Sequence, residues 1–148
     1  MSVIAWDGVL LAADSQLTAG GQISCGRKMR RGKNGVLLAW VGSQSEGQRM
    51  ARWYDAGARP GEFPECACGG QSDESTELIV ILADGSAWTF EHTSEPVRVH
   101  ERKYAWGSGA AYALGALSAG ADAKRAAAIA CQWDSQCGRG VRTLALKA

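Results

Sequence analysis

The chain begins with the stretch Val3-Ile4-Ala5-Trp6-Asp7-Gly8-Val9-Leu10-Leu11-Ala12-Ala13-Asp14. Two apolar runs, residues 3–6 and 9–13, flank Asp7-Gly8. An Asp-Gly pair between two apolar runs is a strong short-range signal for a β-hairpin. Because both runs are continuously apolar rather than alternating, we expect strands that are buried on both faces. The sequence therefore predicts a buried β-hairpin at the start of the fold.

The rest of the chain alternates between expected strands and helices. Turn residues at 18–21, 32–35 and 83–86 separate several of the apolar runs, and residues 57–76 are expected to form a loop. Further strands are expected at residues 22–31, 36–41, 78–82, 87–90, 97–104 and 141–146. This order of elements favours an α+β fold, a four-layer αββα sandwich in which two antiparallel sheets lie between helices. We expect residues 1–148 to form a single domain, a common size for one.

Three helices are expected between these strands. Ser43 or Ser45 can cap the first, and Met50, Trp53 and Tyr54 follow at the i, i+3, i+4 spacing of a helical stripe. The other two are expected over residues 110–119 and 121–133. On the last helix, four side chains are expected to share the buried face: Ala126, Ile129, Ala130 and Trp133.

Composition excludes several classes of protein. The net charge of +1 argues against a dedicated nucleic-acid-binding protein, which would carry a basic surplus. No apolar stretch approaches the ~20 residues of a membrane span, and no signal peptide is visible. Five cysteines, an odd number, favour free thiols in a reducing compartment. We therefore expect a cytoplasmic protein with neither nucleic acid nor membrane as a partner.

Metal and histidine chemistry are not expected. Cys66 and Cys68 could form half of a metal site, but no second pair follows, so we interpret both as loop cysteines. The two histidines, His92 and His100, lie in stretches typical of the surface. No Gly-x-Ser-x-Gly motif supplies a nucleophile for a histidine-dependent triad. Any hydrolytic chemistry would therefore need another base.

The N-terminus offers such a base. Ser2 follows the initiator methionine, and a small second residue permits removal of Met1. The product would carry a hydroxyl and a free α-amine, whose pKa of about 7.7–8.0 lets it accept the hydroxyl proton near neutral pH. Removal of Met1 without any catalytic role explains the same two residues equally well, because very many proteins begin with Met-Ser.

Six segments carry a resemblance to a known family. They are Ser2-Val3-Ile4-Ala5-Trp6-Asp7-Gly8, Leu11-Ala12-Ala13-Asp14-Ser15, Lys28-Met29-Arg30-Arg31, Leu38-Ala39-Trp40-Val41-Gly42-Ser43, Gly107-Ser108-Gly109-Ala110-Ala111-Tyr112-Ala113 and Asp134-Ser135-Gln136-Cys137-Gly138-Arg139-Gly140. In this order and spacing, the chain resembles the proteasome β-subunit family, particularly the small bacterial HslV-type peptidases and their phage-encoded relatives. The resemblance implies an N-terminal-nucleophile (Ntn) hydrolase fold and covers nearly the whole chain.

The resemblance also implies roles for individual residues. Ser2 would be the nucleophile and its own α-amine the general base. Lys28 would tune that amine, Asp14 would hold Lys28 charged and oriented, and the Gly42 N–H would stabilise the oxyanion. Individually, Asp14 and Gly42 could be turn residues, and Lys28 could belong to an exposed basic run.

A supporting group would orient the amine. The resemblance assigns this task to Ser108, Asp134 and Cys137, of which Ser108 could instead cap a helix and Asp134 could end one. Trp40 could line a substrate pocket or pack in the core, and the sequence leaves both open.

The chain departs from the family pattern at three places. Serine replaces the usual threonine nucleophile, which removes the methyl group that restricts χ1. Cys137 stands where serine is usual and supplies only a weak S–H donor. The loop from about Gly57 to Thr76 replaces helical structure that many members carry. This last departure bears on ring assembly and on docking of an ATP-dependent unfoldase.

The functional hypothesis is a threonine-type endopeptidase, here using Ser2. It would cleave peptide or unfolded-protein substrates through an acyl-enzyme, within a homo-oligomeric ring and with an ATP-dependent unfoldase as a further partner. The mechanism requires no metal and no organic cofactor. Two alternatives remain open: a catalytically inactive scaffold or assembly subunit, and a small-molecule amidase with the same mechanism.

Overall fold

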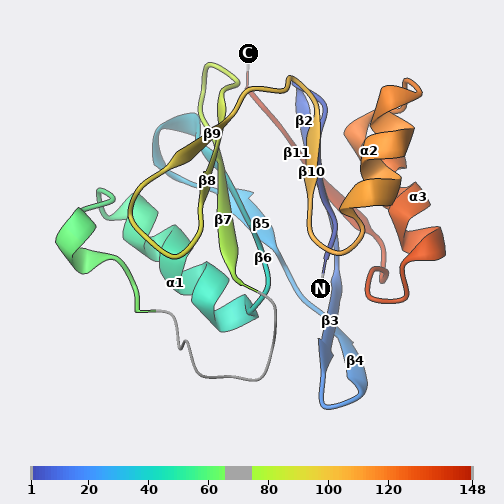
Figure 1. The fold of residues 1–148 in the computed structure, drawn as a ribbon, viewed down its shortest axis with the longest axis horizontal. Coiled ribbons are helices and arrows are strands. Elements are labelled where there is room, and N and C mark those ends of the chain that lie inside the picture. The colour runs from blue at the N-terminus through green and yellow to red at the C-terminus, as the bar shows by residue number, and fades with distance from the viewer. Residues whose placement is uncertain (1, 66–74, 148) are drawn as a thin grey trace.

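The computed structural model describes residues 2–65 and 75–147. Within these residues the chain forms a four-stranded, a five-stranded and a two-stranded sheet, together with three α-helices (Figure 1). All of the strand pairs are antiparallel. The predicted α+β character is confirmed.

The predicted N-terminal hairpin forms the centre of the four-stranded sheet. Strands β1 (Ile4–Trp6) and β2 (Leu10–Asp14) pair with Ile4 opposite Ala13. Every residue of β1 is buried, and so are four of the five residues of β2. Strands β10 (Tyr104–Trp106) and β11 (Val141–Ala145) flank the hairpin, in the order β10-β1-β2-β11. The continuously apolar runs therefore form strands that are covered on both faces.

The five-stranded sheet has the order β5-β6-β7-β8-β9. Its strands are β5 (Met29–Arg31), β6 (Leu37–Val41), β7 (Glu77–Ile81), β8 (Ala87–Phe90) and β9 (Val97–Val99). The separate ribbon consists of β3 (Gln16–Ala19) and β4 (Gln22–Cys25), and it projects from the end of the molecule at which the N-terminus lies (Figure 1). The short 3₁₀ helices are η1 (Lys33–Gly35) and η2 (Pro60–Glu62).

Helices cover the outer faces of both large sheets (Figure 1). Helix α1 (Gln44–Asp55) lies on the five-stranded sheet, where Met50 and Trp53 pack against Leu38 and Leu78. Helices α2 (Ala110–Ser118) and α3 (Ala123–Trp133) lie on the four-stranded sheet. A third apolar cluster joins the two sheets directly. It contains Ile4, Trp6 and Leu11 from one sheet and Leu37, Ile79 and Ile81 from the other.

Two predicted strands are each divided in the structure. Residues 22–31 form β4 in the ribbon and β5 in the five-stranded sheet, because the Gly26 N–H turns back to the Ser15 carbonyl at 2.8 Å. Residues 97–104 likewise supply β9, which pairs with β8, and the first residue of β10, which pairs with β1. The prediction of single strands was wrong because apolar alternation does not encode which sheet a segment joins.

The predicted buried face of α3 is partly wrong. Trp133 is 69% exposed, whereas the buried stripe consists of the small side chains Ala123, Ala126, Ala127 and Ala130. These alanines let α3 approach α2 and the sheet closely, and the buried stripe ends one turn before Trp133. No helix in the described parts of the chain has both the length and the apolar character that crossing a membrane requires.

Candidate functional site

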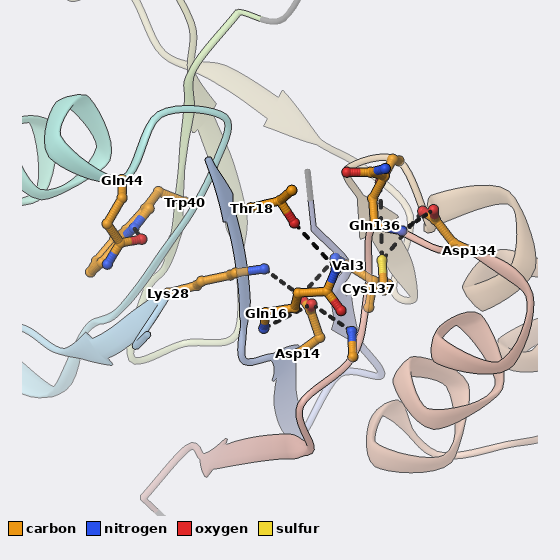
Figure 2. Close-up of polar contacts among 12 residues, drawn as sticks. Val3, Asp14, Gln16, Thr18, Lys28, Trp40, Gln44, Asp134, Gln136 and Cys137 are labelled. Carbon is orange, nitrogen blue, oxygen red and sulfur yellow. Dashed lines mark hydrogen bonds and ion pairs between the residues drawn. The ribbon is translucent and has the colours of Figure 1, made fainter. Parts of the chain in front are cut away.

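A buried ion pair lies at the end of the N-terminal hairpin. Lys28 Nζ donates to Asp14 Oδ1 at 2.8 Å, and the two residues are only 3% and 1% exposed (Figure 2). Three backbone N–H groups also donate to the Asp14 carboxylate: Val3 at 3.1 Å, Gln16 at 3.3 Å and Gly138 at 3.0 Å. The carboxylate thus joins the start of β1, the start of β3 and the segment that precedes β11.

The ribbon β3–β4 brings the two charges together. Asp14 is the last residue of β2, and the chain leaves through β3, returns through β4 and passes Ser15 again at Gly26. A Cβ at position 26 would overlap the Leu17 side chain, so glycine permits this close return. Lys28 then lies immediately before β5, facing Asp14.

Ser2 lies beside this ion pair. It is 2% exposed, and its carbonyl accepts a hydrogen bond from the Gly109 N–H at 3.2 Å. Gly107 has a φ of +94°, and a Cβ there would overlap the Ser2 carbonyl oxygen. Ser2 shares the lining of a cavity of about 350 Å³ with Lys28, Trp40 and Gly42. The Ser2 carbonyl and the Val3 N–H therefore hold the start of the described chain next to the Asp14–Lys28 pair.

Gly42 forms a turn that only glycine adopts readily. Its φ is +92°, and a Cβ at this position would lie 2.8 Å from the Thr76 Cα. Ser43 follows as the N-cap of α1, with its side chain accepting from the Glu46 N–H at 3.4 Å. The turn therefore brings backbone against the same cavity that Ser2 lines.

Thr76 holds this turn in place, a role that sequence reasoning missed. Its hydroxyl accepts from the Ser43 N–H at 3.1 Å and donates to Glu46 Oε2 at 2.6 Å. The prediction placed Thr76 at the end of a loop. No local signal in the sequence pointed to this role, because it depends on the register that sets Val41 opposite Glu77 and so brings Gly42 and Thr76 together.

We predict that Thr76→Val destabilises the protein by about 1–3 kcal/mol, because it removes two hydrogen bonds that contribute about 0.5–1.5 kcal/mol each. Valine keeps the shape but loses both hydroxyl bonds. Urea unfolding of both variants and the wild type measures the change, and Thr76→Ser is the matched control because it keeps the hydroxyl. A loss of stability in Thr76→Ser with no loss in Thr76→Val would assign the stabilisation to packing of the methyl group instead.

The supporting residues Ser108, Asp134 and Cys137 form a second polar cluster. Cys137 Sγ donates to Asp134 Oδ2 at 3.3 Å, and the Gln136 N–H donates to Asp134 Oδ1 at 2.9 Å (Figure 2). Ser108 Oγ lies 4.0 Å from Cys137 Sγ. The next residue, Gly138, donates to Asp14. This hydrogen bond links the cluster to the buried ion pair, so both groups lie around the start of β1.

Two ionisable groups in this cluster have shifted pKa values. Partial burial tends to raise the pKa of Asp134, but hydrogen bonds from Ser108, the Gln136 N–H and Cys137 outweigh it, so the pKa lies below its usual range. Burial raises the pKa of the Cys137 thiol strongly, and the nearby Asp14 and Asp134 charges raise it further. Cys137 is therefore a protonated donor at neutral pH, not a thiolate nucleophile.

Among the described residues, no cysteine or histidine lines the Ser2 cavity. Cys25, Cys131 and Cys137 are free thiols, and burial raises the pKa of Cys131 to about 11. Cys66 and Cys68 lie outside the described residues. His92 and His100 are exposed. Among residues 2–65 and 75–147, no group of three or more His, Cys, Asp or Glu side chains could hold a metal ion.

Trp40 packs in the core and also borders a cavity, whereas its role toward a substrate stays a prediction. It is 3% exposed and packs in the cluster beneath α1, where a Cβ at Gly47 would overlap its ring. It also borders the Ser2 cavity. Its Nε1 donates to Gln44 Oε1 at 3.0 Å, and Gln44 Nε2 donates to the Arg27 carbonyl at 2.6 Å (Figure 2). These bonds hold the ring at the edge of the cavity.

Comparison with known proteins shows which fold this is. Neither a family model nor a curated protein matches the sequence. Among solved structures, BPH of Thiobacillus denitrificans, a bacterial proteasome homologue, matches with a TM-score of 0.69 at 19% identity, over 99% of both chains. BPH in complex with epoxomicin matches with a TM-score of 0.69 at 20% identity, over 100% of both chains.

A eukaryotic protein has the same architecture. HslV from Trypanosoma brucei matches with a TM-score of 0.71 at 22% identity, over 99% of both chains. The chain therefore has the proteasome β/HslV-type fold along its whole length, as the sequence resemblance predicted.

Proposed function

We propose that this protein is an Ntn peptidase whose nucleophile is Ser2, exposed by removal of Met1. The observation that carries the proposal is the Asp14–Lys28 pair, buried beside Ser2 at an Nζ–Oδ1 distance of 2.8 Å. Apolar side chains often stabilise a core as well as a buried ion pair does. A catalytic role would therefore explain why the Asp14 and Lys28 charges are buried beside Ser2. The proposal includes the αββα layering typical of Ntn hydrolases.

The proposed reaction starts with proton transfer from the Ser2 hydroxyl to the Ser2 α-amine. The positive charge of Lys28 disfavours the protonated amine and so lowers its pKa, which leaves more free base at neutral pH. Ser2 Oγ attacks the substrate carbonyl, and the Gly42 N–H stabilises the oxyanion that forms. The C–N bond then breaks as the ammonium proton passes to the leaving amine, and water hydrolyses the resulting ester.

The supporting cluster would orient the α-amine. Ser108 and Asp134 are assigned this task, and Cys137 acts as a donor to Asp134 in place of the usual serine. The thiol keeps its proton because burial and two nearby carboxylates raise its pKa. The serine-to-cysteine departure thus retains a hydrogen-bond donor at 3.3 Å from Asp134, which favours an active site over an inactive scaffold.

Assembly and substrate follow from the same proposal. HslV- and proteasome-like proteins form oligomeric rings and handle protein substrates. We propose that this chain also forms a homo-oligomeric ring and cleaves peptide or unfolded-protein substrates, with an ATP-dependent unfoldase as its partner.

Intact-mass spectrometry with and without a peptide epoxyketone tests the proposal. We expect loss of Met1 and one adduct per chain, located at Ser2 by peptide mapping. A chain that keeps Met1 and forms no adduct would lack the free amine, and the protein would then be an inactive scaffold. Hydrolysis of small amides without any cleavage of peptides would instead indicate the amidase.

A further inference from the structure

Arginines line two neighbouring hollows, and the first of them adjoins the Ser2 cavity. The first, of about 480 Å³, is lined by Arg27, Arg30, Trp40, Gln48 and Arg52. The second, of about 720 Å³, shares Arg27 and Arg30 and adds Arg31 and Arg142. Trp40 borders both the first hollow and the Ser2 cavity. The first arginine-lined hollow and the proposed active site therefore share Trp40 as a lining residue.

Helix α1 forms one wall that runs from the cavity to the arginines. Gln44, Gln48 and Arg52 stand at i, i+4 and i+8 and so share one helix face, which spans about 12 Å. Gln44 lines the Ser2 cavity, whereas Gln48 and Arg52 line the first hollow. The opposite wall is the segment before β5, which Gln44 holds through the Arg27 carbonyl at 2.6 Å. We call the first hollow the arginine groove, defined by Arg27, Arg30, Gln48 and Arg52.

The charge of this groove is only partly neutralised. Arg30 donates to Asp55 at 2.6 Å. Arg27 and Arg52 are exposed, and neither forms an ion pair with any residue in 2–65 or 75–147. The whole chain has a net charge of only +1, so the groove is a local concentration of positive charge. A guanidinium group presents its donors in a planar fork that matches a carboxylate.

We propose that the arginine groove binds acidic side chains of a polypeptide substrate, adjacent to the bond that Ser2 cleaves. This inference rests on the proposed function. A peptide fits the position of the groove, which adjoins the Ser2 cavity at Trp40. A nucleic acid fits less well, because Trp40 is 3% exposed and offers no free ring face on which a base could stack.

A pair of matched probes tests the proposal. Two peptide epoxyketones differ only in Glu or Gln next to the reactive group, and the rate of adduct formation is followed by intact mass at low ionic strength. Partly exposed charge pairs contribute up to ~1 kcal/mol each, so we expect wild type to react about tenfold faster with the Glu probe. Arg27→Gln and Arg52→Gln should each lower this preference about threefold.

Arg49→Gln is the matched control. Arg49 is also an exposed arginine of α1, but it does not line the groove. The Glu/Gln preference should be the same in this variant as in wild type. Equal rates with the two probes in wild type, or an equal loss of preference in Arg49→Gln, would overturn the proposal.

A binding measurement separates this inference from the proposed function. If neither probe forms an adduct, the peptidase proposal fails, and the groove is then tested by fluorescence anisotropy with labelled Glu-rich and Gln-rich peptides. Tighter binding of the Glu-rich peptide, weakened by Arg27→Gln and Arg52→Gln, would support the groove. Equal binding would overturn it. Tighter binding of an oligothymidylate with the same arginine dependence would also overturn it, in favour of a nucleic-acid site.

Discussion

Ser2→Ala is expected to abolish adduct formation and peptide hydrolysis. Removing a serine nucleophile lowers the turnover rate by about 10⁶-fold. The backbone at position 2 is unchanged, so the carbonyl still accepts from the Gly109 N–H. Alanine is also small enough to permit Met1 removal, so the variant should still expose an α-amine. Reaction rate with a peptide substrate, intact mass and urea unfolding together measure the result.

Two further variants make this prediction specific. Ser2→Thr restores the nucleophile usual in the family, and the added methyl restricts χ1, so we expect activity to be retained. Ser118→Ala is the matched control, since Ser118 is an exposed serine at the end of α2. Turnover by Ser2→Ala that equals the wild-type rate would exclude Ser2 as the nucleophile. A large loss in Ser118→Ala would show that the assay reports stability rather than chemistry.

Asp14→Ala is expected to lower the free energy of unfolding by about 3–5 kcal/mol, the usual cost of removing one partner of a buried ion pair. The substitution takes away the carboxylate that neutralises Lys28, which is 3% exposed. It also removes the acceptor shared by the N–H groups of Val3, Gln16 and Gly138. Urea unfolding, with the slope checked for two-state behaviour, measures the loss.

Lys28→Met should cost less stability but most of the activity. The Asp14 carboxylate keeps its three backbone donors in this variant, whereas the positive charge beside Ser2 is lost. Without that charge, the amine stays largely protonated at neutral pH. The Glu62→Ala variant is the stability control, because the Arg59–Glu62 pair is exposed and should contribute at most ~1 kcal/mol. A wild-type turnover rate in Lys28→Met would remove Lys28 from the proposed mechanism.

Local patterns in the sequence predicted most of the elements. The Asp7-Gly8 turn between two apolar runs predicted β1 and β2, and the apolar run 36–41 predicted β6. Ser43 was one of two expected caps for α1, and the structure confirms it as the N-cap. These features depend on residues that are close in sequence. Hydrophobic periodicity and turn chemistry therefore suffice to predict them.

Motif order predicted which residues of the candidate site would come together. Asp14 and Lys28 form the expected buried pair, and Cys137 contacts Asp134 as expected. Their catalytic roles remain predictions. The sequence could not indicate that Trp40 both packs in the core and borders the cavity. That outcome depends on how closely Gly47 lets α1 approach the ring.

Strand pairing decided what the sequence left undetermined. Residues 22–31 divide between the neighbouring strands β3 and β6, and residues 97–104 divide between the neighbouring β8 and the distant β1. Apolar alternation is the same for either partner, so it does not encode these divisions. Thr76 reaches the Gly42 turn only through the register of β6 and β7. Trp133 is exposed because the alanine stripe of α3 ends before it. Sequence alone thus determined the type of most elements, although the predicted turn at 18–21 overlaps strand β3. Only the tertiary structure decided which sheet each strand joins, the register of each strand pair and which side chains are buried. These features depend on how the elements pack against one another.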